Sequence, residues 1–229
     1  MRLNLWLVLI LLIGAVLRLA WIDKYPAGFT PDEASFGYDA YSILKTGKDQ
    51  WGNSFPLSFR SFGDFKAPLY TYLTIPPVAI FGLNEYAVRL PNALLGILAV
   101  VVTYFLVVEL FKRQTESSGV RNNAEKIATI AALLLALSPW HVSLSRGAFE
   151  ANLTTLLMPL GVLAFIKGTT APKWMFVSAL SFGLNLFSYH SAKLVTPIII
   201  GLLVTTNYAY MRANVRKYKL AILTFFIFT

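Results

Sequence analysis

The chain begins with a long apolar run, LNLWLVLILLIGAVLRLAWI (Leu3–Ile22), and a polar motif follows, GFTPDEASFG (Gly28–Gly37). Twenty residues at about 1.5 Å each cover the hydrocarbon core of a bilayer, so the run predicts a first membrane span. A cleaved signal peptide is the alternative. The run is long for one, however, and no Ala-x-Ala cleavage site follows Arg18. The motif therefore places two adjacent carboxylates, Asp32 and Glu33, just past the end of a span.

The composition indicates an all-α, polytopic transmembrane protein. Of 229 residues, 56% are hydrophobic and 14% are charged, and the mean hydropathy is +0.61. Soluble domains carry about 25% charged residues. The net charge of +9 is explained by basic cytoplasmic loops facing anionic lipid, and we expect no nucleic-acid partner. The chain has no cysteine, so disulfides and thiol catalysis are excluded.

Apolar segments predict about seven membrane helices in one transmembrane module covering residues 1–229. After the first span, these segments are 87–111, 127–137, 151–166, 174–189, 194–211 and 220–229. The last is too short to cross a bilayer, so we expect the seventh helix to continue past Thr229.

A large first loop, at about residues 23–86, separates the first two spans. Within it we expect a short helix over 34–44, capped by Thr30 or Asp32. An apolar piece over 69–81 is broken by Pro76 and Pro77 and predicts a re-entrant or interfacial helix.

The loop charges predict the orientation. With the N-terminus in the cytoplasm, 11 of the 20 basic residues fall on the cytoplasmic side, as the positive-inside rule requires. Only three of the 11 acidic residues, Glu109, Glu116 and Glu125, fall there. The first loop, the turn near 138–150 and the turn near 190–193 then lie together outside the cytoplasm. We expect this face to carry the functional groups.

Each candidate pair of side chains has a structural alternative. The adjacent carboxylates Asp32 and Glu33 suit a general base near a low-dielectric boundary, or a helix N-terminus. Arg146 and Glu150 are spaced to pair on a helix, either in a site or as a structural ion pair.

Basic residues are the other candidates. His190 and Lys193 share a helical face and suit a phosphate or a metal, or they are interfacial anchors. Lys66 and Arg89 flank the short apolar piece and suit an anion or the interface.

Four stretches resemble, in order, motifs of the protein O-mannosyltransferase and lipid A aminoarabinose transferase group, polytopic glycosyltransferases of the GT-C type. They are Thr30–Gly37, Lys66-Ala67-Pro68-Leu69-Tyr70, Arg89-Leu90-Pro91 with Gly96, and Ser145–Glu150. Ala67 stands where the group usually has proline. The resemblance covers residues 1 to about 210.

The resemblance implies an enzyme of the EC 2.4 class that uses a sugar on a polyprenyl phosphate in the bilayer, with a protein, lipid or glycan as acceptor. Asp32 would be the base, Glu33 would position the acceptor, and Glu150 would be a second acidic group near the sugar. The donor phosphate would be bound by basic residues, for which the candidates are Lys66, Arg89, Arg146, His190 and Lys193. Arg89 would alternatively orient the acidic pair. The site would lie outside the cytoplasm and the anomeric centre would be inverted. A divalent metal is an open possibility.

Two other classes fit the same residues. A transporter or flippase of lipid-linked sugars would also need charged groups at a membrane pocket. It should show internal repeats, and the sequence has none. A non-catalytic membrane assembly subunit would tolerate Asp32→Asn and Glu33→Gln.

Overall fold

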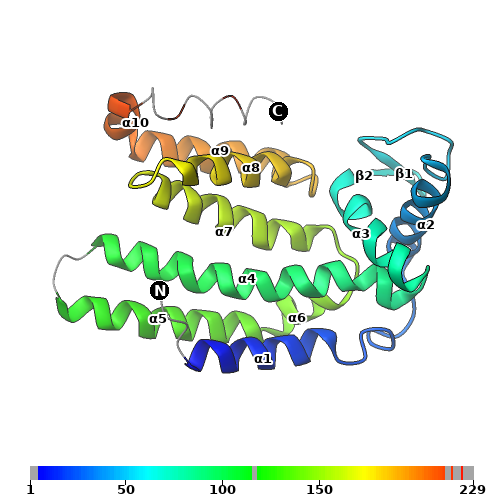
Figure 1. Ribbon diagram of the computed structural model, residues 1–229, viewed down its shortest axis with the longest axis horizontal. Coiled ribbons are helices and arrows are strands. Elements are labelled where there is room, and N and C mark those ends of the chain that lie inside the picture. The colour runs from blue at the N-terminus through cyan, green and yellow to red at the C-terminus, as the bar shows by residue number, and fades with distance from the viewer. Residues whose placement is uncertain (1–4, 115–117, 215–217, 219–222, 224–229) are drawn as a thin grey trace.

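The computed structural model describes residues 5–114, 118–214, 218 and 223. Within these residues the chain forms ten helices and one two-stranded antiparallel hairpin (Figure 1). The elements are α1 Leu5–Leu19, α2 Pro31–Thr46, β1 Phe59–Ser61, β2 Asp64–Lys66, α3 Pro68–Phe81, α4 Glu85–Gln114, α5 Ser118–Leu137, α6 Pro139–Arg146, α7 Ala151–Gly168, α8 Lys173–Leu186, α9 Ala192–Thr206 and α10 Tyr208–Asn214.

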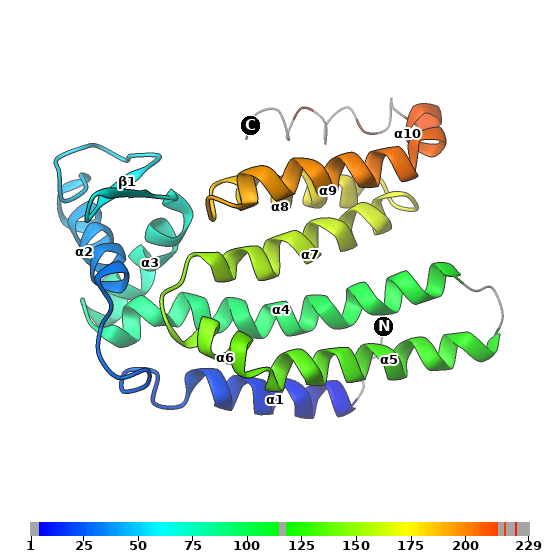
Figure 2. The ribbon, with the colours of Figure 1, turned by 180° about the vertical axis from the view of Figure 1, so that it is seen from behind.

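The longer helices run side by side, and α2, α3 and the hairpin collect at one end of them (Figures 1 and 2). Small residues allow this close packing. Ala128, Ala132 and Ala136 of α5 are fully buried at a spacing of four residues. A methyl group added at Gly96 of α4 would lie 2.2 Å from the Oγ of Ser145 on α6. Small side chains let helix backbones approach each other where no solvent drives association.

Two helices of the described residues, α4 and α7, are long and apolar enough to cross a membrane. The pair α5 and α6, bent by 55° at its break, makes a third if it counts as one span. Helices α1 and α9 are apolar but shorter. At about 1.5 Å per residue, 15 residues cover about 22 Å of a core about 30 Å thick. The described residues thus form a mostly helical bundle with two to three candidate spans. The seven spans predicted from the sequence are not shown by this structure. The expected helix over 220–229 lies outside the described residues.

A buried arginine holds the bend between α5 and α6. Arg18 of α1 has no exposed surface and donates hydrogen bonds to the carbonyls of Leu135 and Ala136 at the end of α5. Its Nη2 lies 2.8 Å from the Nδ1 of His141 on α6. The guanidinium therefore satisfies carbonyls that the helix break leaves without partners.

Several elements differ from the sequence prediction. Helix α3 continues through Pro76 and Pro77 rather than breaking there. Helix α5 begins at Ser118, before the apolar segment predicted over 127–137, so the helix extends beyond its apolar part. The predicted span 194–211 is divided between α9 and α10, with Asn207 ending α9.

Candidate active site

The first turn of α2 orients two neighbouring carboxylates in different directions. Thr30 is the N-cap and Pro31 occupies the first turn. The Glu33 N–H donates to Thr30 Oγ1 at 3.2 Å, and Glu33 Oε2 accepts from the Thr30 N–H at 2.9 Å. This capping box draws Glu33 into the protein. Glu33 is 1% exposed, whereas the Asp32 side chain is 61% exposed. Adjacent residues in the sequence thus occupy opposite environments.

Glu33 is neutralised by Arg89 of α4. Arg89 Nε donates to Glu33 Oε1 at 2.7 Å and Nη2 donates to Oε2 at 3.1 Å. The Ala148 N–H also donates to Oε1, at 3.1 Å. Burial by itself raises the pKa of the Glu33 carboxyl, but these hydrogen bonds and the guanidinium charge outweigh burial and hold the pKa below its usual range. Glu33 is therefore a fixed, ionised carboxylate within the protein.

Arg89 has no donor left for a phosphate in this structure. Its Nη1 donates to the carbonyls of Ile22 and Pro26, both at 3.0 Å, and its Nη2 also donates to the carbonyl of Gly28. The guanidinium has no exposed surface. Arg89 therefore joins α2 to the segment after α1. Of the two roles expected for it, orienting the acidic pair agrees with this geometry.

Asp32 contacts a basic residue of the hairpin. The Lys66 ammonium, at the end of β2, forms an ion pair with Asp32 Oδ1. The same ammonium lies 4.8 Å from the ring centroid of Phe36, one turn along α2. Lys66 is buried while Asp32 faces outward. The pair thus links an exposed carboxylate to the interior of a neighbouring pocket.

That pocket is basic. It has a volume of about 430 Å³ and lies between the hairpin, the start of α3 and the α8–α9 turn. Lys66, His190 and Lys193 all line it. His190 Nε2 lies 2.6 Å from the carbonyl oxygen of Phe65, which fixes the ring against the hairpin. The Lys193 ammonium makes no ion pair with the described residues. We call this space the basic pocket.

Glu150, the residue before α7, faces the same charges. Burial raises the pKa of its carboxyl to about 7, against the lowering effects of Lys66 and His190. The charge of Asp32 raises it further. Its Oε2 is buried and makes no hydrogen bond within the described residues. The structure thus brings Asp32, Lys66, Glu150 and His190 together.

Arg146 lies outside this group. Helix α6 ends at Arg146, so the i,i+4 geometry expected with Glu150 does not exist, and no ion pair joins them in the described residues. The guanidinium instead donates to the carbonyls of Leu17, Ala20 and Tyr25 at 2.7–2.9 Å. A cation suits the C-terminal end of a helix, here α1.

The sequence prediction missed two features: backbone groups of the hairpin that contact site residues, and a second pocket beside the hairpin. The Phe65 carbonyl and the Ala67 N–H lie beside His190 and Glu150. No side-chain pattern signals a backbone group. It also missed a second pocket, lined by Trp51, Arg60 and Tyr38 among others. The aromatic content of the first loop was the available signal.

Metal ligands form no cluster in the described part of the chain, where no group of three or more His, Asp or Glu side chains is placed to hold an ion.

The convergence of the three connections does agree with the sequence prediction. The first loop, the α6–α7 turn and the α8–α9 turn lie at the same end of the bundle (Figure 1). The Ala148–Glu33 and His190–Phe65 contacts join them.

Comparison with known proteins adds two findings. A family model described as dolichyl-phosphate-mannose-protein mannosyltransferase matches residues 65–229, which begin after the Asp32-Glu33 motif. Two crystal structures of ArnT from Cupriavidus metallidurans, one bound to undecaprenyl phosphate and one in the apo state, are similar in fold. Both have a TM-score of 0.69, with 19% and 18% identity. Each similarity covers 98% of this chain and 40% of the ArnT chain. No curated protein sequence matches the chain.

Proposed function

The chain belongs to the dolichyl-phosphate-mannose-protein mannosyltransferase family, and from this we propose that it carries the acidic site of an integral membrane glycosyltransferase. The enzyme moves a sugar from a polyprenyl-phosphate donor to an acceptor hydroxyl, with inversion, on the extracytoplasmic side. The observation that carries the proposal is the Asp32–Lys66 pair, because it joins an exposed carboxylate to a basic pocket. The ArnT structure bound to undecaprenyl phosphate, a lipid phosphate, supports the choice of donor.

In the proposed reaction Asp32 takes the proton of the acceptor hydroxyl. The hydroxyl oxygen attacks the anomeric carbon from the side opposite the phosphate. The bond from that carbon to the phosphate oxygen breaks, and its electron pair leaves on the polyprenyl phosphate. Proton transfer by a positioned side chain contributes about 10²–10⁴-fold in rate.

The basic pocket receives the leaving phosphate. Lys66, His190 and Lys193 line it, and cations placed where charge develops stabilise the transition state. Lys66 pairs with Asp32 and also lines this pocket. When the donor binds, the Lys66 ammonium leaves the Asp32 carboxylate and contacts the donor phosphate. Glu150 is the second acidic group, near the sugar; its Oε2 is buried and makes no hydrogen bond within the described residues.

Glu33 and Arg89 act as positioning residues. Their mutual contacts use the Glu33 carboxylate and the Arg89 guanidinium within the protein. The pair fixes the start of α2, and with it the direction of Asp32. We assign Arg146 a role in holding α1 rather than in binding the donor.

The test is sugar transfer by the natural full-length protein in liposomes, with a panel of labelled polyprenyl-phosphate sugars. Wild type is compared with Asp32→Asn and with Asp23→Asn, an exposed carboxylate of the same loop. We expect transfer by wild type and Asp23→Asn and a loss of at least about 100-fold in Asp32→Asn. Donor movement between leaflets that survives Asp32→Asn, with no transfer from any donor, would overturn the proposal and favour a flippase.

A further inference from the structure

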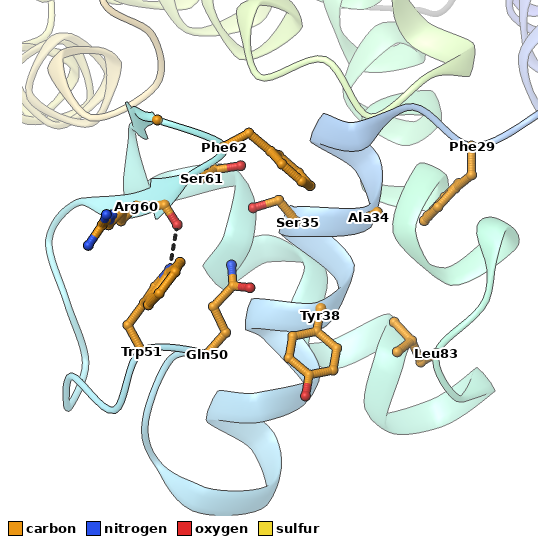
Figure 3. Close-up of a pocket in the computed structure, with 11 residues that line it drawn as sticks. Phe29, Ala34, Ser35, Tyr38, Gln50, Trp51, Arg60, Ser61, Phe62 and Leu83 are labelled. Atoms are coloured by element: carbon orange, nitrogen blue, oxygen red, sulfur yellow. Dashed lines mark hydrogen bonds between the residues drawn. The ribbon is translucent and has the colours of Figure 1, made fainter.

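A second pocket is lined by other residues of the hairpin than the basic pocket. It has a volume of about 590 Å³, within the range of small-molecule sites of about 300–1,000 Å³. Most of its lining comes from α2, the hairpin and the segment between them (Figure 3). It includes Ser35, Tyr38, Gln50, Trp51, Arg60 and Ser61. We call it the aromatic pocket.

Aromatic side chains in this pocket are exposed although the protein has apolar cores to receive them. Trp51 is 54% exposed, Tyr38 53% and Phe62 78%. Trp51 is held in place, since its Nε1 donates to the Arg60 carbonyl at 2.9 Å and the Arg60 guanidinium lies 4.7 Å from its ring centroid. A fixed aromatic face lowers the entropy lost when a ligand binds.

Polar side chains line the same space. Ser61 is buried, and its Oγ makes no hydrogen bond within the described residues. The Ser35 hydroxyl is turned to the Asp39 carboxyl one turn along α2, where its hydrogen bond lowers the pKa that burial raises. Gln50 is fixed, because its backbone N–H and Nε2 donate to the Asp39 carboxylate at 3.0 and 3.1 Å. Its side-chain oxygen stays available as an acceptor. An unpaired buried hydroxyl is unfavourable, so Ser61 points to a ligand.

The pocket adjoins the proposed base. Asp32 and Ser35 are three residues apart on α2 and share a face, as do Ser35 and Tyr38. Asp32 is thus the first of three α2 side chains in a row, and the other two, Ser35 and Tyr38, line the aromatic pocket. The ion-pair partner of Asp32, Lys66, lines the basic pocket. An acceptor in one pocket and a donor phosphate in the other would meet at Asp32.

We propose that the aromatic pocket is the acceptor subsite and that it binds a saccharide ring, so that the acceptor is a glycan or the sugar headgroup of a glycolipid. This inference rests on the proposed function. A sugar ring presents an apolar face for aromatic side chains and hydroxyls at its rim, each of which donates and accepts, as Ser61 and Gln50 require. An acyl chain would leave those groups unpaired. The one charged lining residue is Arg60, which agrees with a neutral or anionic sugar.

The test measures binding separately from turnover. Saturation-transfer NMR on the full-length protein in nanodiscs uses methyl glycosides of glucose, mannose, galactose and N-acetylglucosamine, with a serine-containing pentapeptide as the comparison ligand. The variants are Tyr38→Ala and Trp51→Ala. The control is Tyr41→Ala, which removes another part-exposed tyrosine of α2 outside the pocket.

We expect at least one glycoside to bind wild type and Tyr41→Ala, and to bind Tyr38→Ala and Trp51→Ala on the order of tenfold more weakly. Absence of glycoside binding to wild type, or binding unchanged in both pocket variants, would overturn the inference. The inference would also be overturned if wild type bound the pentapeptide and no glycoside, and if Tyr38→Ala and Trp51→Ala lost the pentapeptide binding. The occupant would then be a peptide. Glycoside binding that follows the pocket variants, with no transfer from any donor, would leave the subsite standing and remove the proposed function.

Discussion

The two adjacent carboxylates have different proposed roles, Asp32 as the base and Glu33 as a positioning residue, and this difference gives a prediction for stability and activity. All four hydrogen bonds to the Glu33 carboxylate are donated into it, from Arg89 Nε, Arg89 Nη2, the Thr30 N–H and the Ala148 N–H. In Glu33→Gln, whichever oxygen becomes an amide group faces two of these donors. The Arg89 charge also loses its counterion in a place with no solvent exposure.

The expected cost of Glu33→Gln follows from this geometry. Removing one partner of a buried ion pair costs about 3–5 kcal/mol. Two lost hydrogen bonds to a charged group, at about 1.5–3 kcal/mol each, give a similar value. At about 2–4 °C per kcal/mol, Tm should fall by roughly 6–20 °C. Asp32→Asn breaks a pair whose carboxylate is 61% exposed although Lys66 is buried. Its cost should lie between the about 0–1 kcal/mol of an exposed pair and the about 3–5 kcal/mol of a buried one, so Tm should fall by less than in Glu33→Gln.

The assay is thermal unfolding in detergent, followed with transfer activity on the same preparations. We expect Asp32→Asn to be inactive at a Tm above that of Glu33→Gln, and Glu33→Gln to be destabilised, with activity lost in proportion to the folded fraction. The double variant Glu33→Gln/Arg89→Gln should cost less than the sum of its single variants, because both singles remove the same pair. A Glu33→Gln protein with the wild-type Tm and no activity would refute the reasoning, since Glu33 would then act on the substrate.

Three further predictions follow from the same structure. The raised pKa of Glu150, about 7 against an ordinary 4.5, means that the folded state binds more protons between these values, so the stability from Glu150 is full below about pH 4.5 and is lost as pH rises through about 7. Wild-type Tm should fall relative to Glu150→Gln between pH 5 and 8, and parallel Tm curves would contradict this. Lys193→Met should raise the KM for the polyprenyl-phosphate donor about tenfold with little change in acceptor KM, because the ammonium lines the basic pocket. Lys45→Met, at the far end of α2, is the matched control. Equal effects of the two variants on the donor KM would exclude a phosphate contact by Lys193. Gly96→Ala should lower stability by about 1–3 kcal/mol because its methyl group would overlap α6. Gly201→Ala on α9, where nothing lies within 4 Å, should be neutral or stabilising, and similar Tm values for the two glycine variants would show that the α4–α6 contact is not tight.

The sequence by itself determined what depends on local spacing and on the solvent. Apolar segments such as Leu3–Ile22 and 87–111 are long enough for membrane helices, in which every backbone group is paired within the segment, and this decides the class. Thr30, Pro31 and Glu33 are enough to begin a helix at this point, since a cap involves residues three apart. The order of spans and loops placed the three acidic or basic connections on one face. The ordered motifs indicated a family that the family model confirms.

Only the tertiary structure decided which charged groups are buried and which face a pocket. Asp32 and Glu33 are equivalent in a sequence, yet one meets Lys66, 34 residues away, and the other meets Arg89, 56 residues away. Arg146 fits a donor site by type, but its guanidinium satisfies carbonyls in the last turn of α1 and just after it, 121 or more residues earlier in the chain. The free energy of a charge depends on the solvent and countercharges around it. Those surroundings come from distant segments, so residue type and spacing do not specify them.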